Sequence, residues 1–390
     1  MRLSETPDFN AISLEALRRR RGTKWTRYPP DVLPAWVADM DFDMAEPIRA
    51  GLAGMMEAND LGYAPKLPAS GLPEAFAAFA ARRFPGWEVA PERMAAIADI
   101  VQGIHLAIEA YTRPGDGICT LTPVYPPFLQ AVAETGRRLD HCTMVRGDGR
   151  YEIDFDALRA AIDGRTRILL LCTPHNPLGR VFERDELDEL ARIAVERDLL
   201  VIADEIHADI VYPGFRHIPF ASLGPEVEAR TVTMTSATKS FNIAGLRCAV
   251  VLFGSDRLAE RFNAWPERIR GAVNSFGMEA TRIAWTECDE WLDALLAHLE
   301  GNRDFLHAFV AERLPGMRMV LPAATYLGWL DCREFGLEPD PYTWFLDRAR
   351  VGFNDGRDFG DGGDGHVRIN FATSRAILAQ VLERMEEALQ

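Results

Sequence analysis

Residues 231–247 have the sequence TVTMTSATKSFNIAGLR, in which an apolar run leads into a lysine among hydroxyl side chains. The run at 231–234 predicts a short buried strand. A lysine at the end of such a strand can lose hydration, which lowers its pKa and lets its amine form a Schiff base. The hydroxyl groups and Arg247 suit a phosphate group. Lys239 is therefore a candidate for holding pyridoxal phosphate, with a surface lysine in a polar loop as the alternative when this motif is taken alone.

Apolar runs separated by helical segments precede this stretch. The predicted strands lie at 94–97, 118–121, 167–172 and 199–203, and the predicted helices at 104–111, 128–134, 155–161 and 184–197. Strands that are apolar on both faces and alternate with helices predict a parallel sheet covered on both sides. In such sheets ligands bind at the carboxyl ends of the strands. The predicted fold class is therefore α/β.

The length of 390 residues suits one large and one smaller domain. Beyond residue 285 the pattern changes to antiparallel strands and amphipathic helices, predicted at 291–310, 318–321, 324–330, 341–349, 367–371 and 374–389. We expect an N-terminal arm at 1–45 that forms part of the small domain, a large domain at 46–285 and a small domain at 286–390. A strand breaking into a loop is predicted at 32–42, and a linker near 262–277.

Composition argues against several classes of function. The chain has 58 acidic and 43 basic residues, and a net charge of −15 is unfavourable for binding nucleic acid or an anionic membrane. The six cysteines are scattered without a CxxC pair, as expected of reduced core thiols. No apolar run approaches membrane-spanning length, and no signal-like segment opens the sequence. We expect a cytoplasmic protein that acts on a small molecule and needs no metal.

Polar residues at the predicted strand ends form a candidate site. Asp204 ends an apolar strand, where a buried carboxylate needs a cation, and a protonated pyridine nitrogen is such a cation. Asn176 can donate to a phenolate oxygen, and Tyr125 can stack on a ring. Taken singly, they could be a structural carboxylate, a turn residue before proline and a core aromatic residue. Together with Lys239 they suit an aromatic cofactor.

Two further groups suit anions. Ser236, Arg247 and the backbone N–H groups of Ile100 and Val101, at a predicted helix start, could hold a phosphate. Arg368, on a late strand, could pair with a substrate carboxylate through two parallel hydrogen bonds. A structural salt bridge is the alternative for this arginine.

The order Tyr, Asn-Pro, Asp, Ser-x-x-Lys, Arg, Arg resembles that of fold-type I pyridoxal-phosphate enzymes of the aminotransferase class I/II superfamily. The resemblance covers nearly the whole chain and is strongest to the cystathionine β-lyase, or C–S lyase, branch. It implies a large domain with a mostly parallel, seven-stranded sheet sandwiched by helices, and a smaller α+β domain formed by the C-terminal part and the N-terminal arm. The stretches that carry it are LPAWVADMDF (33–42), LGY (61–63), TPVYPPF (122–128), CTPHNPLG (172–179), DEIHADIVY (204–212), SATKSFNIAGL (236–246), YLGWLD (326–331), NDG (354–356) and VRINFAT (367–373).

The resemblance also implies roles for single residues. Lys239 would bind the cofactor and remove the substrate's α-proton. Asp204 would pair with the pyridine nitrogen and Asn176 with the 3′-oxygen, while Tyr125 would stack on the ring. Ser236, Arg247, Ile100 and Val101 would bind the phosphate. The substrate would contact Arg368, Trp36 and Ala38. Tyr63 would reach the phosphate of a neighbouring subunit, so a homodimer is expected.

Three features bear on the reaction type. His207, another expected cofactor contact, stands where aminotransferases usually carry a tyrosine, and the lyase branch typically has histidine there. Arg247 is more typical of aminotransferases. The phosphate turn begins Asp99-Ile100-Val101-Gln102, where the lyase branch usually has Gly-Val-Val-Pro.

We therefore expect an α,β-elimination that converts cystathionine, or a related S-substituted L-cysteine, into a thiol, pyruvate and ammonia. Amino transfer from an L-amino acid and a specialised biosynthetic reaction on the same scaffold are the alternatives. A regulatory protein that binds a partner through its surface is the non-enzymatic alternative, although no stretch of the sequence marks a docking site.

Overall fold

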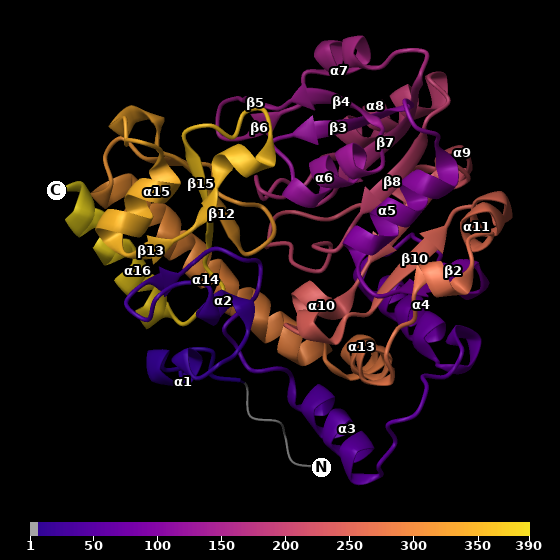
Figure 1. Ribbon diagram of the computed structural model, residues 1–390, viewed down its shortest axis with the longest axis horizontal. Helices are drawn as coiled ribbons and strands as arrows, with labels where there is room; N and C mark the ends of the chain where they lie inside the picture. The colour runs from indigo at the N-terminus through magenta and orange to yellow at the C-terminus, as the bar shows by residue number, and fades with distance from the viewer. Residues whose placement is uncertain (1–6) are drawn as a thin grey trace.

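A seven-stranded sheet forms the centre of the larger part of the molecule in the computed structural model, which describes residues 7–390 (Figure 1). The strand order is β2-β10-β9-β8-β7-β3-β4. β10 runs antiparallel to both of its neighbours, and the pairs from β9 to β4 are parallel. The strands are β2 (Met94–Ile97), β3 (Gly117–Thr122), β4 (Arg138–Thr143), β7 (Thr166–Cys172), β8 (Leu200–Asp204), β9 (Thr231–Thr235) and β10 (Ala249–Phe253). The predicted mostly parallel sheet is confirmed.

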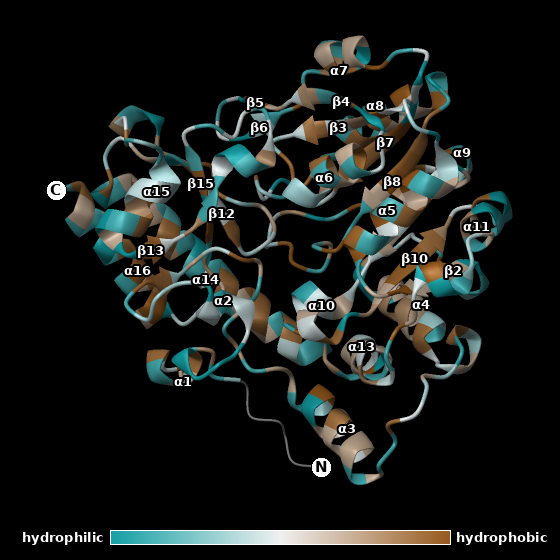
Figure 2. Ribbon diagram, in the orientation of Figure 1, coloured by the Kyte–Doolittle hydropathy of each residue, from teal (hydrophilic) through white to brown (hydrophobic). Residues whose placement is uncertain are grey.

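Side chains of the central strand β7 alternate between two apolar cores. Ile168, Leu170 and Cys172 belong to one core, and Leu169 and Leu171 to the other. Figure 2 shows β7 and β8 as hydrophobic strands lying among the helices. A strand buried on both faces has no solvent-facing positions, so its sequence is a continuous apolar run. The edge strand β4 has exposed positions and lacks such a run, so the apolar pattern does not predict it.

Helices close both cores. α5, α6 and α11 contribute to the core of Ile168, and α7 and α8 to that of Leu169. A further group is formed by α13, which packs against α3 and α4. The helices of this larger part are α3 (Glu46–Glu57), α4 (Leu72–Arg83), α5 (Ile100–Tyr111), α6 (Pro126–Glu134), α7 (Phe155–Ala161), α8 (Arg184–Glu196), α9 (Pro225–Glu228), α10 (Ala237–Ser240), α11 (Asp256–Asn263), α12 (Glu267–Arg270) and α13 (Ser275–Glu287).

The C-terminal part forms a second sheet, which is antiparallel and has the order β11-β12-β15-β14. In the N-terminal arm, β1 pairs with β13, so the arm joins this smaller α+β part as predicted. The remaining elements are α1 (Leu14–Arg18), α2 (Thr23–Thr26), β1 (Leu33–Pro34), β5 (Val145–Arg146), β6 (Tyr151–Glu152), α14 (Asp289–Arg313), β11 (Arg318–Met319), β12 (Leu327–Asp331), α15 (Pro341–Trp344), β13 (Val351–Gly352), β14 (Asn354–Asp355), β15 (His366–Asn370) and α16 (Arg375–Leu389). Among residues 7–390, no helix combines the length and apolarity needed to cross a membrane.

Several predicted element bounds are wrong. The strand expected over 32–42 is limited to β1, because much of the following backbone bonds to asparagine side chains instead of a neighbouring strand. The strand expected from 324 begins at Leu327, after Thr325, whose backbone is left-handed (φ 68°). The helix expected at 341–349 is divided into α15 and a π-helical turn. The segment expected as a linker, 262–277, contains α12 and the start of α13.

Candidate active site

A cavity of about 530 Å³ lies where β7, β8 and β9 end. The ends of these strands are in register, with Cys172 beside Asp204 and Asp204 beside Met234. Residues that follow different strands therefore converge at this edge of the sheet. The lining includes ten of the residues predicted from sequence, namely Ala38, Ile100, Val101, Tyr125, Asn176, Asp204, His207, Ser236, Lys239 and Arg247.

Lys239 enters the cavity from α10, directly after β9. Its Nζ donates a hydrogen bond of 2.8 Å to the carbonyl oxygen of Ala38. Loss of hydration lowers the pKa of the amine, and the carboxylate of Asp39 opposes this shift. The neutral amine, which is the form that acts as nucleophile and base, is therefore favoured relative to an exposed lysine.

Asp204 is the last residue of β8, and its carboxyl group is buried. One oxygen accepts a hydrogen bond of 3.1 Å from the backbone N–H of Ile206. Burial raises the pKa of this carboxyl group to about 7. Within residues 7–390 no lysine, arginine or histidine forms a salt bridge with it. The surroundings of Asp204 would thus be completed by a cationic group in the cavity.

His207 is a neutral ring beside Asp204. Burial lowers the pKa of its imidazole to about 3, so the ring carries no charge near neutral pH. Nδ1 is buried and has no hydrogen-bond partner in the described part of the chain. The ring forms a T-shaped contact with the ring of Tyr326, with centroids 6.1 Å apart. His207 also lines the cavity, so its ring suits contact with a ligand.

Asn176 and Arg368 are joined behind the cavity wall. Nη1 of Arg368 donates to Oδ1 of Asn176 at 2.9 Å, which leaves the amide N–H groups of Asn176 for other acceptors. Nη2 of Arg368 donates to Oδ1 of Asn354 at 2.7 Å. The Nε atom is buried and unpartnered among the described residues, and burial lowers the pKa of the guanidinium to about 10. No carboxylate pairs with Arg368 in residues 7–390, so the structural salt bridge is not observed there.

The opposite end of the cavity holds the groups predicted to bind phosphate. Ile100 and Val101 begin α5, and their N–H groups precede the first hydrogen bonds of that helix. Ser236 caps α10 and donates to the carbonyl oxygen of Cys248 at 2.6 Å. Arg247 is 63% exposed and forms an ion pair with Asp99. The structure thus brings a guanidinium and free helix-terminal N–H groups together, with an acidic side chain beside them.

Three predicted site residues are absent from the lining of the cavity: Arg368, which lies behind its wall, Trp36 and Tyr63. The ring of Trp36 does not line the cavity, and Cζ of Arg27 lies over it, 4.6 Å from the ring centroid. Only the backbone oxygen of Trp36 accepts a hydrogen bond from Arg368. Tyr63, in the loop after α3, is fully exposed and absent from the cavity of its own chain. The substrate contact predicted for Trp36 and the phosphate contact predicted for Tyr63 stay predictions.

Residues 35–42, which we call the strap, are held by contacts that the sequence pattern does not predict. Asn242 donates to the carbonyl oxygens of Met40 and Phe42 at 3.1 and 2.7 Å and accepts from the N–H of Met40. Asn370 donates to the carbonyl oxygens of Val37 and Asp39 at 2.6 and 2.7 Å. The two asparagines therefore fix the strap, Asn242 from the turn that follows α10 and Asn370 from β15.

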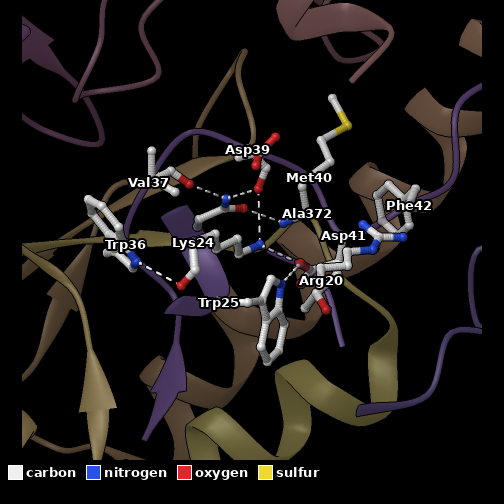
Figure 3. A network of polar contacts seen from close by, with 12 residues as sticks. Arg20, Lys24, Trp25, Trp36, Val37, Asp39, Met40, Asp41, Phe42 and Ala372 are labelled. Carbon is white, nitrogen blue, oxygen red and sulfur yellow. Dashed lines mark hydrogen bonds and ion pairs between the residues drawn. The ribbon is translucent and has the colours of Figure 1, made fainter. Parts of the chain in front are cut away.

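A buried ion pair anchors the C-terminal end of the strap. Nζ of Lys24 lies 2.9 Å from the carboxylate of Asp41, and both side chains are only 2% exposed. Nε1 of Trp25 donates to the same carboxylate at 2.8 Å, and Lys24 also donates to the carbonyl oxygen of Asp39 (Figure 3). In the sequence, Lys24 and Trp25 are followed by a segment that contains Asp39 and Asp41. This pattern offers the partners of an ion pair, but sequence alone does not show that these groups meet.

Comparisons with known proteins agree with this geometry. The model of the family described as aminotransferase class I and II matches residues 47–385. The cystathionine beta-lyase of Corynebacterium glutamicum is 37% identical over 376 residues, covering 96% of this chain and 99% of that protein. Cystalysin from Treponema denticola, solved with pyridoxal 5′-phosphate, has a TM-score of 0.92 and 31% identity over 98% of both chains. The C–S lyase from Staphylococcus hominis, also solved with the cofactor, has a TM-score of 0.92 and 29% identity, covering 98% of this chain and 99% of that one.

Proposed function

Because the chain belongs to the aminotransferase class I and II family, we propose that it is a pyridoxal-phosphate-dependent carbon–sulfur β-lyase. Its substrate would be cystathionine or a related S-substituted L-cysteine. The reaction breaks the Cβ–S bond and consumes one water, giving a thiol, pyruvate and ammonia. The similarity to the lyases of Corynebacterium and Staphylococcus supports this proposal.

The residues of the cavity fit pyridoxal phosphate. Asp204 is a buried carboxylate without an ion-pair partner in the described residues, as a protonated pyridine nitrogen requires. His207 lines the cavity and its buried Nδ1 has no hydrogen-bond partner among the described residues, while Asn176 keeps its amide N–H groups available. At the other end, Arg247, Ser236 and the first N–H groups of α5 suit the phosphate group. Tyr125 lines the cavity with its ring available for stacking.

Lys239 would carry the chemistry of the site. When bound, pyridoxal phosphate withdraws electrons from the substrate's Cα and so makes its proton acidic. The amine of Lys239, with its lowered pKa, would remove that proton at Nζ. The carbonyl oxygen of Ala38 orients the amine at 2.8 Å, so the strap sets the direction from which the proton is taken.

The remaining residues would bind and orient the substrate. Arg368 would pair with the substrate carboxylate, since its guanidinium has no carboxylate partner among the described residues and its Nε is unsatisfied. Ala38 would contribute through the strap backbone. Asp204 would hold the ring nitrogen in its cationic form, which keeps electron withdrawal strong throughout the reaction.

The observation that carries the proposal is the convergence of Lys239, Asp204 and His207 on one cavity, each with a pKa displaced by burial. The test is to incubate the purified holoenzyme with cystathionine and with S-methylcysteine, without any keto acid, and to measure pyruvate. We expect steady pyruvate release from the parent enzyme and none from Lys239→Ala. No pyruvate from a panel of cysteine conjugates would overturn the proposal.

Amino transfer is the second candidate, because Arg247 lies at the phosphate end as in aminotransferases and the family includes them. It predicts that an amino acid changes the absorption spectrum of the bound cofactor and that a keto acid reverses the change. Scoring pyruvate release and amino transfer on the same samples separates the two. A specialised biosynthetic reaction would show neither with common substrates.

The assembly and compartment are further parts of the proposal. Tyr63 is fully exposed, away from its own cavity, which supports a two-fold homodimer in which it reaches the partner's phosphate site. A fully active monomer in solution would contradict this. All six cysteines are free and buried, which fits the reducing cytoplasm.

A further inference from the structure

Asp99 occupies an unusual place at the phosphate end of the cavity. It is the N-cap residue of α5, and its Oδ1 accepts a hydrogen bond of 2.8 Å from the N–H of Gln102. Its Oδ2 forms the ion pair with Arg247. One carboxylate therefore binds a helix-terminal N–H group and the guanidinium at the same time.

These are the two kinds of group that a phosphate uses when it binds at a helix N-terminus. Asp99 lines the cavity together with Ile100, Val101 and Arg247. A carboxylate at this position adds a negative charge beside the place where a dianionic phosphate would lie, and like charges at such distances repel. It also neutralises the charge of Arg247.

We propose that Asp99 competes with the cofactor phosphate for Arg247. Its carboxylate pairs with Arg247 when the cofactor is absent and weakens binding of the phosphate group. The inference rests on the proposed assignment of Arg247 to the phosphate. It holds equally for elimination and for amino transfer.

The side chain of Arg247 is placed to change partners. The side chain is 63% exposed, and its guanidinium binds no residue other than Asp99 within 7–390, so little holds it against the carboxylate. Ser236, by contrast, already donates to the buried carbonyl oxygen of Cys248. Arg247 is thus the cation that Asp99 and a phosphate would share, and cofactor retention would depend more on Lys239 than in a site without this aspartate.

The test compares two ligands on the cofactor-free protein, pyridoxal phosphate and pyridoxal, which lacks the phosphate. Asp99→Asn keeps an N-cap side chain while removing the charge, and Asp99→Ser is a second capping variant. We expect both variants to lower the dissociation constant of pyridoxal phosphate about tenfold, the order set by one unit charge in partly hydrated surroundings. The dissociation constant of pyridoxal should stay unchanged.

Asp154→Asn is the matched control, because Asp154 caps α7 in the same way, accepting from the N–H of Ala157 at 2.9 Å, but lies outside the cavity. Arg247→Ala should weaken binding of pyridoxal phosphate and leave that of pyridoxal unchanged. An unchanged or larger constant for pyridoxal phosphate in both Asp99 variants would overturn the inference. If Arg247→Ala also has no effect, the assignment of Arg247 to the phosphate is the part that fails.

Discussion

Lys24 and Lys239 both bind the strap, yet their amines meet different surroundings. Lys24 is almost completely buried and donates to a carboxylate and a carbonyl oxygen. Lys239 is partly open to the cavity and donates to a single carbonyl oxygen, that of Ala38. Burial without a direct ion pair lowers the pKa of the Lys239 amine, so this amine gives up its proton more easily than an exposed lysine does. The strap thus separates a structural cation from a reactive amine.

Substitution of Lys239 is expected to have the largest effect, which falls on activity and cofactor retention and not on the stability of the cofactor-free protein. Lys239→Ala removes the base that takes the α-proton, so kcat should fall by on the order of 10⁴-fold. The free energy of unfolding of the cofactor-free protein should change little, because the side chain loses only one neutral-acceptor hydrogen bond. Steady-state kinetics and urea unfolding of the same preparations test both statements. A variant that retains most of its activity would remove Lys239 from the mechanism.

Substitution of Lys24, unlike that of Lys239, should mainly lower the free energy of unfolding. Lys24→Met leaves the buried carboxylate of Asp41 without its cation, which costs about 3–5 kcal/mol in comparable pairs. The double variant Lys24→Met/Asp41→Leu should recover much of this loss. Arg20→Met, which breaks the exposed pair with Asp43, is the control and should cost less than about 1 kcal/mol. Equal effects of the Lys24 and Arg20 substitutions in urea unfolding would contradict the comparison.

Asp204 is a buried acidic group without an ion-pair partner among the described residues, in contrast to Asp41, and it should make the stability of the protein depend on pH. In the cofactor-free protein its pKa of about 7 lies above the ordinary value of 3.8. The folded state therefore binds the proton more tightly between about pH 4 and 7, so the free energy of unfolding falls as the pH rises through this range and levels off above it. Asp204→Asn lacks this loss and should gain a few kcal/mol relative to the parent by pH 8.

Urea unfolding of the cofactor-free parent and Asp204→Asn at pH 5 and pH 8 measures this gain. In the holoenzyme the same substitution should weaken cofactor binding, because the cationic ring nitrogen loses its partner. A stability difference that is the same at both pH values would show that Asp204 titrates normally in the folded protein.

The sequence predicts the reactive lysine better than the structural one, for a physical reason. Lys239 and Asp204 follow apolar runs that predict buried strands, and parallel strands end at a common edge, so the pattern of the runs alone indicates that the two residues meet. The pairing of Lys24 with Asp41 depends on how the strap bends around Asn242 and Asn370, which no periodicity encodes. The same limit applies to the contact between Asp99 and Arg247, because side-chain partners in irregular segments are set by the folded backbone.

The smallest expected effects come from single hydrogen bonds on the two sides of the strap. Tyr326 donates to the carbonyl oxygen of Ala38 at 3.1 Å, and Trp25 donates to Asp41 at 2.8 Å. Tyr326→Phe and Trp25→Phe should each cost about 1–2 kcal/mol of stability, with Trp25→Phe the larger because its acceptor is charged.

The kinetics of Tyr326→Phe and Trp25→Phe should differ. Tyr326→Phe changes the surroundings of the oxygen that orients Lys239, so it should alter kcat and its pH profile, with little change in KM. Trp25→Phe should leave the pH profile of kcat unchanged, because Asp41 keeps its ion pair with Lys24 and the strap stays in place. Identical pH profiles for the two variants would mean that the carbonyl oxygen of Ala38 does not tune the amine, and that the two lysines differ through the ion pair of Lys24 with Asp41.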